Sequence, residues 1–353
     1  MQSISTRPSG PRFTRGRWAA GAALGCAMLA TAIIGAPVAA VEPGATPAGV
    51  ACAGPAAGKV SCWAAENNAT DSVGGNNGVL ENGVGFAAGV VGKAFVFDGV
   101  DDIVSVANNA SINFAPGDAM SVSFWMRLTS SASIEHLIGK RDVCSTEEFN
   151  WQVAFDTSGF QFGGKPPNGT LVAKPAMNTW VHVTGTQTGN KWRLYLNGDL
   201  AATKVGKLGP LNTVAMLLGR SGLTCAPYGG LLDEVQIWRR ALTDDQVAQT
   251  YRANAACPAK PGAPASLAPA ANQTVSTKRP TLDWTARGCA TSYKVVVRRG
   301  SKTGPVVVNR SGLASSSFTT PALAGGKTWA WRATACNAHG CRDGAWKTFK
   351  TPR

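Results

Sequence analysis

Short runs of alternating apolar and polar residues, each ended by glycine, asparagine or aspartate, dominate the sequence from Lys59 to about Thr213. Successive side chains of a β-strand point to opposite faces of a sheet, so this alternation is typical of half-buried strands. Because many short strands follow one another with almost no helical periodicity, the pattern predicts an all-β sandwich or jelly roll. The clearest runs are SVSFWMRL (121–128), FNWQVAF (149–155), WVHVTGTQ (180–187) and KWRLYLNG (191–198).

A second series of strands predicts another domain at 275–353. Its density of short strands is typical of an immunoglobulin-like sandwich. Two Pro/Gly/Ala-rich segments, 41–58 and 258–274, predict linkers on either side of a first domain at 59–257. The strand runs are RPTLDWTA, SYKVVVRRG, GPVVVNRSG, SSSFTTPAL, TWAWRATA and GAWKTFKT.

One helix is expected in RRALTDDQVAQTYR, near the end of the first domain. Thr243 is a suitable N-cap and two acids follow it in the first turn. Leu242, Val247 and Tyr251 are spaced to form a single apolar face.

Residues 1–40 have the features of a secretory signal peptide. The basic segment RFTRGRW precedes the apolar stretch AAGAALGCAMLATAIIGA, and PVAA places Val38 and Ala40 at the −3 and −1 positions of a cleavage site. Small residues dominate the stretch, which favours cleavage over a membrane anchor. No other run is long and apolar enough to span a bilayer. We therefore expect a secreted protein with no transmembrane segment once the signal is removed.

The cysteine count agrees with export. Nine cysteines less Cys26 in the signal leave an even number, which predicts a disulfide framework. A zinc site is the alternative, and ACNAHGCRD with His339 is the nearest candidate. That cluster lacks a fourth ligand, so a disulfide is favoured.

Positive charge is concentrated at the C-terminus. Residues 41–257 contain 15 Lys and Arg against 18 Asp and Glu, whereas residues 258–353 contain 15 against 2. Such a basic domain indicates an anionic partner. For an exported chain we expect an anionic cell-envelope polymer or acidic polysaccharide rather than nucleic acid.

A known family shares the order of motifs in 59–257. These residues resemble the laminin-G-like, concanavalin-A-like jelly roll of bacterial exported proteins, and residues 260–352 are similar to a fibronectin type III domain. The first resemblance implies a jelly roll but not one function, because such domains include sugar-binding and adhesive modules. It depends on CWAAENNATDSVGGNNG, VGKAFVFDGVDDIVSV, SVSFWMRL, WVHVTGTQTGNKWRLYLNGDL, LLGRSG and GLLDEVQIWRRALTDDQV.

The motif FDGVDD (97–102) combines three acids. In a jelly roll, AFVFDG is expected to be a strand and VDD the turn into the strand IVSV. Asp98 before Gly99 suits a tight turn, because Asp bonds to nearby backbone and Gly tolerates positive φ. We expect Asp101 and Asp102 on the exposed side of that turn. A metal-ligand role for Asp98 is the weaker alternative.

No catalytic constellation is evident, so we expect a protein that is not an enzyme. Glycosidases of this fold need two carboxylates on one face of one strand, and no strand has an E-x-D-x-x-E arrangement. His136 has no matching Ser or Asp context in the sequence, and no glycine-rich phosphate loop is present.

Calcium is the expected cofactor, because jelly rolls of this class often hold one ion where the first and last strands meet. Asp71 and Asp233 match the acidic positions of the family at those two ends, with Glu66 and Asn76 as further partners. Alternatively, Asp71 caps a turn and Asp233 bonds to buried backbone donors.

Several side chains are candidates for binding carbohydrate. Trp151 and Tyr228, together with Phe149 and Trp192, fall at strand edges or in loops, where a flat ring can stack on a sugar. Arg141 and Arg220 lie nearby in the motifs and can donate to hydroxyls or carboxylates. The other aromatics at family strand positions are expected in the core, namely Trp63, Phe97, Trp125, Trp180, Tyr195 and Trp238.

Two disulfides are expected from the loops that hold the cysteines, Cys144–Cys225 between two jelly-roll loops and Cys336–Cys341 across a hairpin. The other four cysteines allow two arrangements. Cys52 pairs either with Cys257 across the ends of the jelly roll or with Cys62, which leaves Cys257 for Cys289.

Together these features predict a secreted, non-catalytic binding protein. Its jelly roll binds a carbohydrate or glycoconjugate, and its basic domain attaches it to an anionic surface. A structural or adhesive protein that contacts another protein is the alternative, and a glycan-active hydrolase is the least favoured.

Overall fold

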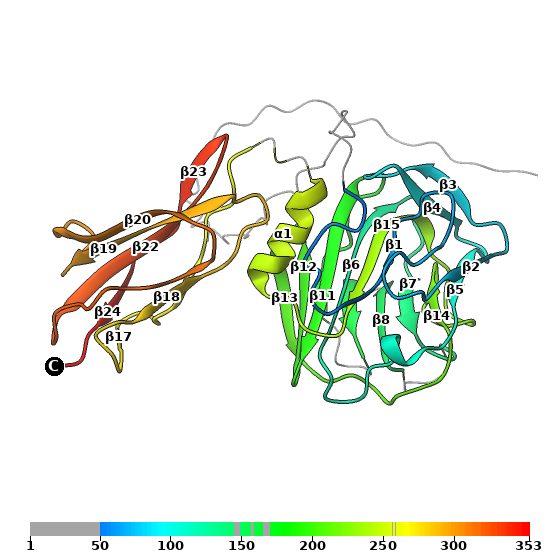
Figure 1. Cartoon of the computed structure of the whole chain (residues 1–353), viewed down its shortest axis with the longest axis horizontal. Helices are drawn as coiled ribbons and strands as arrows, with labels where there is room; N and C mark the ends of the chain where they lie inside the picture. The colour runs from blue at the N-terminus through cyan, green and yellow to red at the C-terminus, as the bar shows by residue number, and fades with distance from the viewer. Residues whose placement is uncertain (1–49, 145–148, 157–158, 165–169, 256, 258) are drawn as a thin grey trace, which may run out of the picture. The chain divides into compact units, whose positions relative to one another are not determined.

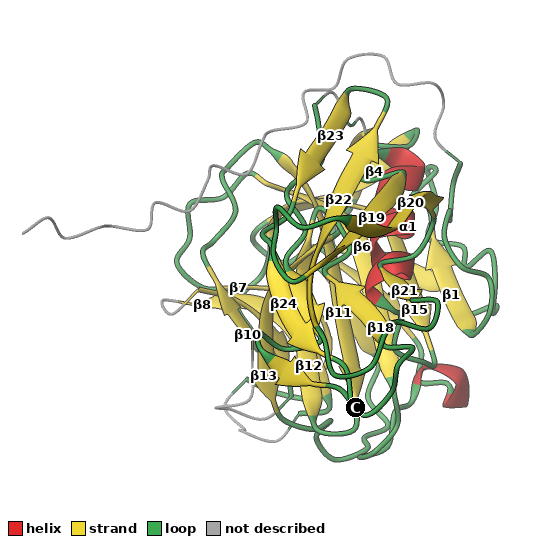
Figure 2. Ribbon diagram, turned by 90° about the vertical axis from the view of Figure 1, so that its left-hand side faces the viewer, coloured by secondary structure: helices red, strands yellow, loops and turns green. Residues whose placement is uncertain are grey.

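A computed structural model describes residues 50–144, 149–156, 159–164, 170–255, 257 and 259–353 of this chain. The predicted signal peptide and most of the predicted linker at 41–58 lie outside the described residues. Within them the fold is nearly all β, as the sequence predicts, with strands in two domains and one α-helix (Figures 1 and 2).

The first domain is a sandwich of two antiparallel sheets. One sheet has the strand order β13-β12-β11-β6-β15-β4-β3, and β1 also pairs with β15. Its central strand β15 is buried along its whole length, because α1 and the first residues of the domain pack near it. The strands are β1 (Lys59–Trp63), β3 (Gly85–Ala88), β4 (Lys93–Asp98), β6 (Met120–Leu128), β11 (Trp180–Thr188), β12 (Lys191–Leu196), β13 (Asp199–Val205) and β15 (Gly229–Trp238).

The second sheet has the order β10-β9-β8-β7-β14-β5-β2. Consecutive strands such as β7, β8 and β9 pair as neighbours, whereas β14 returns from late in the chain to lie between β7 and β5. The strands are β2 (Gly78–Glu81), β5 (Ile103–Val106), β7 (Glu135–Lys140), β8 (Trp151–Asp156), β9 (Gly159–Gly163), β10 (Thr170–Val172) and β14 (Met216–Leu218).

Alternation along the strands builds the core between the two sheets. On β6, Phe124 and Met126 face the opposite sheet, and Trp125 between them faces the other way. Trp125 is still buried, because α1 (Asp244–Asn254) covers that face and the ring of Tyr251 lies 5.6 Å from its ring. The six aromatics that the sequence assigns to the core are all buried.

The helix begins as its sequence predicts. Thr243 is the N-cap, its side chain accepts from the backbone of Gln246, and the Gln246 side chain accepts from the backbone of Thr243. This capping box satisfies two backbone donors that the helix itself leaves unpaired. A single 3₁₀ turn, η1 (Ala110–Ile112), precedes β6.

The FDGVDD motif crosses from one sheet to the other. β4 ends at Asp98 and β5 begins at Ile103, and Asp98 Oδ1 accepts from Val100 N at 2.7 Å in the predicted turn. The expectation of an exposed Asp102 is wrong. It is only 5 % exposed, because its Oδ2 turns back to accept from Asp98 N at 3.0 Å.

The end of the segment predicted as a linker at 41–58 packs against the first domain. Residues 52–58 belong to the segment assigned to a linker, yet Trp238 Nε1 donates to the carbonyl oxygen of Pro55 at 2.8 Å. A disulfide joins Cys52 to Cys62 in β1. A Pro/Ala-rich composition excludes regular periodicity, but it does not prevent a segment from packing on its neighbours.

The second domain is a smaller β-sandwich, and fibronectin type III similarity stays a prediction. One sheet has the order β16-β18-β21 and the other β17-β24-β22-β19-β20, with β23 beside β22. β16 and β17 lie inside the segment predicted as a linker at 258–274, where they form sheet edges that tolerate Pro-rich neighbours. The strands are β16 (Ser266–Ala268), β17 (Gln273–Thr274), β18 (Thr281–Trp284), β19 (Ser292–Arg299), β20 (Val306–Leu313), β21 (Ser317–Thr319), β22 (Thr328–Asn337), β23 (Gly340–Asp343) and β24 (Lys347–Lys350).

All eight cysteines after the predicted signal form disulfides. The Cys144–Cys225 and Cys336–Cys341 pairs are those expected from the sequence. Of the two arrangements left open, the structure has Cys52–Cys62 and Cys257–Cys289. Among the described residues, no helix is long and apolar enough to cross a membrane.

Candidate functional site

The segments that follow β4, β7 and β14 are joined to one another by side-chain hydrogen bonds and a disulfide. We call residues 98–102, 141–144 and 219–228 the loop rim. The Arg220 guanidinium donates to the carbonyl oxygens of Val100 and Leu223, which joins two of the loops. Cys144 is bonded to Cys225 and its N–H donates to Thr224 Oγ1 at 2.9 Å, which joins the third.

A buried polar cluster lies below the rim, on strands β7 and β8. His136 Nδ1 is 2.8 Å from Ser221 Oγ and 3.2 Å from Gln152 Oε1. The same Gln152 oxygen accepts from Arg141 Nη1 at 3.1 Å, and an atom that accepts from arginine cannot itself be a donor. An amide oxygen only accepts, so His136 Nδ1 hydrogen-bonds to Gln152 only in the tautomer with the ring proton on Nδ1, and Nε2 faces Cys144 Sγ at 3.7 Å.

Ser221 is a partner of His136 that the local sequence does not indicate. The contact does not resemble an activated nucleophile, because Ser221 is 0 % exposed and no substrate atom can reach its hydroxyl in this arrangement. Burial lowers the pKa of His136 to about 4, so the ring is neutral near pH 7. The cluster supports the rim from below and offers no general base to the surface.

Two groups of metal-ligand side chains occur in the loop rim and directly below it. His136, Cys144 and Cys225 have ligand atoms within 4.8 Å of one another, but the two sulfurs are joined as a disulfide and neither is a thiolate. Asp98, Asp101 and Asp102 form the other group. There Asp98 and Asp102 already accept backbone N–H groups of their own turn, which accounts for their positions.

The predicted ligand-binding arginines lie in the loop rim but bind the protein itself. Arg141 is 8 % exposed, and its guanidinium donates to the carbonyl oxygens of Val143 and Cys144 and packs on the ring of Phe149. Arg220 holds the turn at Val100 in the same way. Both side chains shape the loops in this structure.

The predicted stacking aromatics are not on the surface. Trp151 and Tyr228 are both 0 % exposed, and Phe149 and Trp192 are 2 % and 0 % exposed. A ring without exposed surface cannot stack on a sugar, so these assignments are wrong for the described conformation. Strands β8 and β12 place Trp151 and Trp192 inward, and Trp151 packs edge-on against Phe162 in the core.

Asp71 does not fit a calcium ion in this arrangement. Its two oxygens together accept four backbone N–H groups at 2.8 to 3.1 Å, which uses the acceptor capacity of the carboxylate. The side chain of Asn76 is bonded at both ends, because its NH2 group donates to Ser61 and Ser111 and its Oδ1 accepts from Ser111 Oγ at 3.3 Å. The four donors to Asp71 are the N–H groups of Cys62, Val73, Gly74 and Asn76.

Asp233 has a carboxylate oxygen that accepts no hydrogen bond from the described residues, whereas both oxygens of Asp71 accept them. Its Oδ2 accepts from Val90 N and Val91 N at 2.7 and 3.0 Å, whereas its buried Oδ1 has no hydrogen-bond partner in the structure. Among the described residues, neither Asp71 nor Asp233 belongs to a group of three clustered His, Cys, Asp or Glu ligands. A calcium ion held by Asp233 stays a prediction, and one shared with Asp71 is not supported by these contacts.

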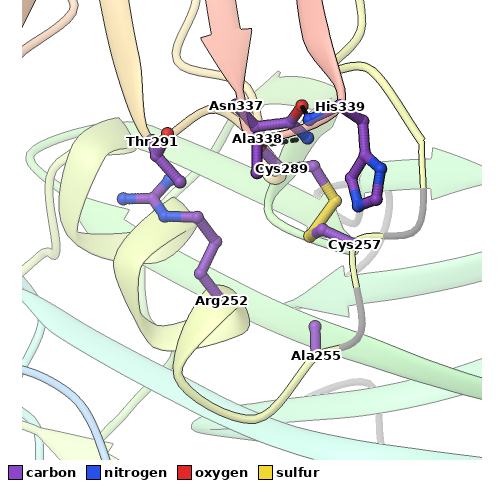
Figure 3. Close-up of a pocket in the computed structure, with 8 residues that line it drawn as sticks. All are labelled: Arg252, Ala255, Cys257, Cys289, Thr291, Asn337, Ala338 and His339. Carbon is purple, nitrogen blue, oxygen red and sulfur yellow. Dashed lines mark hydrogen bonds between the residues drawn. A yellow bond between two sulfur atoms is a disulfide. The ribbon is translucent and has the colours of Figure 1, made fainter.

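Two pockets lie away from the loop rim. One of about 180 Å³ borders the Cys257–Cys289 disulfide, and Figure 3 shows Arg252 and His339 among the side chains around it. The other, of about 280 Å³, is lined by Lys191 and Arg193 together with Ala241 and Leu242. The candidate residues Arg141, Trp151, Arg220 and Tyr228 line neither of the two.

Residues 98–248 match the Laminin_G_3 family model, described as the concanavalin A-like lectin/glucanases superfamily. The match begins at Asp98, includes the whole loop rim and ends within α1. A comparison with curated proteins gives no match.

Three solved structures illustrate what the chain is similar to. Domain 4 of AbnA, a GH43 extracellular arabinanase from Geobacillus stearothermophilus solved in complex with arabinotriose, is 19% identical, with coverage of 54% of this chain and 96% of that one and a TM-score of 0.44. The binding domain of Paraclostridial Mosquitocidal Protein 1 is 15% identical, with coverage of 83% and 91% and a TM-score of 0.46. The binding domain of Botulinum Neurotoxin DC, in complex with SialylT, is 14% identical, with coverage of 81% and 73% and a TM-score of 0.44.

Proposed function

We propose that this chain is a secreted, non-catalytic binding protein. Its jelly roll binds a carbohydrate or glycoconjugate, and its basic C-terminal domain attaches it to an anionic cell-envelope polymer. The matched superfamily contains both lectins and glucanases, so the choice between binding and catalysis depends on the site.

The polar cluster below the loop rim favours binding. Its members are an imidazole, an amide, a hydroxyl and a guanidinium, and they hydrogen-bond to one another. A glucanase needs an acid and a second carboxylate on either side of the scissile bond. The exposed carboxylates of the described rim are instead Asp98 and Asp101 in one turn and Asp142 in another loop, where they can accept from sugar hydroxyls.

A polysaccharide-binding assay on the whole chain tests this function. We expect mobility in affinity electrophoresis to fall with at least one neutral polysaccharide, and the double variant Asp101→Asn/Asp142→Asn to restore it. Asp118→Asn is the matched control, because this partly exposed acid pairs with Arg239 outside the loop rim. Retardation that is equal in all three proteins would move the sugar site away from the rim, and release of reducing ends would contradict the non-catalytic proposal.

A protein ligand is the second candidate. Val100 and Leu223 in the loop rim are 65 % and 62 % exposed, and the Arg220 guanidinium bonds to both of their carbonyl oxygens. Exposed apolar side chains on two loops that share one guanidinium suit a protein contact better than a sugar hydroxyl. A Leu223→Asp variant that keeps polysaccharide binding but loses a protein partner would favour this alternative.

A further inference from the structure

One face of the second domain combines four cations with a tryptophan, and two of the cations lie against its ring. On β22, Trp329 and Trp331 point into the core, so the alternate residue Arg332 lies on the outer face. The register continues this face across the neighbouring strands, with Val296 opposite Arg332 and Thr328 opposite Lys350. We call the outer residues Lys294, Arg298, Arg332, Trp346 and Lys350 the basic sheet face.

Trp346 lies beside the two arginines of this face. It directly precedes Lys347, which pairs with Trp331, so Trp346 stands beside Arg332. The Arg332 guanidinium lies 4.9 Å from the Trp346 ring centre, and the Arg298 guanidinium lies 5.9 Å from it. The two cations are therefore held close to one flat, partly exposed indole.

The charge of the face is largely unbalanced. Arg332 pairs with Asp343 at 2.8 Å, and Asp343 is one of two acids in residues 258–353. Arg298 donates to the neutral carbonyl oxygen of Gly304 at 2.7 Å. No ion pair between described residues includes Arg298, Lys294 or Lys350, so their charge is available to an anionic ligand.

The arrangement fits a linear polyanion with sugar rings. Lys294 and Arg298 stand four residues apart on β19, roughly 13 Å, and adjacent strands are about 4.8 Å apart. Cations repeated at such intervals suit a chain with repeated anions, and planar guanidinium groups bind carboxylate or sulfate through two hydrogen bonds. An indole also offers an apolar surface for the ring of a sugar.

We propose that the basic sheet face binds an acidic polysaccharide, with Trp346 packed on a sugar ring and Arg298 and Arg332 bonded to its carboxylate or sulfate groups. This inference rests on the proposed attachment role of the C-terminal domain and gives that role a site. Single-stranded nucleic acid is less suited, because it usually requires successive aromatic platforms and this face has one.

The test measures the binding of the whole chain to polygalacturonate and to heparin at moderate salt. Trp346→Ala and Arg298→Gln are each expected to weaken binding about tenfold, whereas Trp346→Phe keeps a flat apolar ring and most of the affinity. Arg279→Gln is the matched control, because Arg279 is exposed and lies outside the face. This substitution removes the same single positive charge as Arg298→Gln. Thermal unfolding of each variant checks that the domain stays folded.

The possible results distinguish a failure of the basic sheet face as the binding site from a failure of the attachment function of the C-terminal domain. A wild-type chain that binds no polyanion contradicts the attachment function itself. A wild-type chain that binds, with Trp346→Ala equal to wild type and Arg279→Gln equal to Arg298→Gln, contradicts the site and leaves diffuse charge attraction. The proposed ligand class would be wrong if a thymine oligonucleotide bound more tightly than either polysaccharide and its binding were weakened by Trp346→Ala in the same way.

Discussion

Asp233 and Glu234 are consecutive residues of β15 that both lie buried, 0 % and 1 % exposed, and each has one carboxylate oxygen without a hydrogen-bond partner. They occupy an irregularity in the pairing of β15 with β6, where Glu234 has a φ of 54°. Burial raises the pKa of Asp233 to about 8 and that of Glu234 to about 7.

These two acids predict that the free energy of unfolding falls as pH rises from about 7 to 8, a range in which the buried His136 and His182 are neutral in both the folded and the unfolded chain. An acid whose pKa is higher in the folded state binds its proton more tightly there, so its contribution is present at low pH and is lost as pH rises through the folded-state pKa. Urea unfolding between pH 7 and 8 measures the slope. Asp233→Asn should flatten it and stabilise the protein at pH 8, whereas Asp118→Asn should leave it unchanged. A slope of opposite sign in wild type contradicts the prediction.

Calcium binding at Asp233 predicts an effect on the melting temperature that is distinct from the pH dependence. If its unpartnered Oδ1 binds the ion, calcium should raise the melting temperature of wild type at pH 8 by several degrees and have no effect on Asp233→Asn. Chelator should reverse the rise. The disulfide at Cys52 and Cys62 lies close to the same end of the domain, so the scan is repeated under reduction. A melting temperature that does not change with calcium, both with the disulfides intact and under reduction, excludes the site.

Asp71 is expected to stabilise the fold without calcium. Asp71→Ala removes the acceptor for four backbone N–H groups and leaves several of them buried, which should cost about 2 to 4 kcal/mol of unfolding free energy. Asp98→Ala is the comparison, because Asp98 accepts one exposed N–H and should cost about 0.5 to 1 kcal/mol. Equal losses in the two variants, or a loss at Asp71 that appears only with calcium, would contradict this role.

Patterns that act over a few residues could be predicted from the sequence. Alternation in 121–128 gives β6, and Thr243 with Gln246 starts α1, because strand period and helix capping depend on neighbours in the chain. The turn at Asp98 could be predicted for the same reason, because it depends on residues next to each other in the chain.

The positions of the candidate site residues depend on distant segments and could not be predicted. The sequence places Trp151 near a strand edge, but only the pairing of β7, β8 and β9 shows that its ring points into the core. The contact of His136 with Ser221 joins residues 85 positions apart. Alternation within β7 and β8 puts His136 and Gln152 on one face, which is the one signal that could have indicated the cluster.

Substitutions of the buried aromatics should lower the stability of the jelly roll without changing its affinity for polysaccharide. Trp151→Phe should destabilise the jelly roll by about 2 kcal/mol through a lost core contact. Tyr228→Phe should cost about 1 kcal/mol, since its hydroxyl donates to the Arg127 carbonyl oxygen at 3.0 Å. Polysaccharide affinity, measured at a temperature where both variants are folded, should equal that of wild type. A tenfold loss of affinity in either folded variant would restore these rings as ligand contacts.

The disulfides should differ in how much they stabilise the protein, because they close loops of different length. Cys144 and Cys225 are 81 positions apart and tie the loop rim together, whereas Cys336 and Cys341 are 5 positions apart in one hairpin. Loop-closure entropy predicts a loss of about 4 to 5 kcal/mol for Cys144→Ala/Cys225→Ala and about 2 kcal/mol for Cys336→Ala/Cys341→Ala. Urea unfolding of the two double variants measures both values. Because the first pair also holds the rim loops in position, its removal should weaken polysaccharide binding even in the folded protein, and the second should not. The reverse order of stabilities would contradict the entropic account, and unchanged binding in the first variant would place the sugar site outside the loop rim.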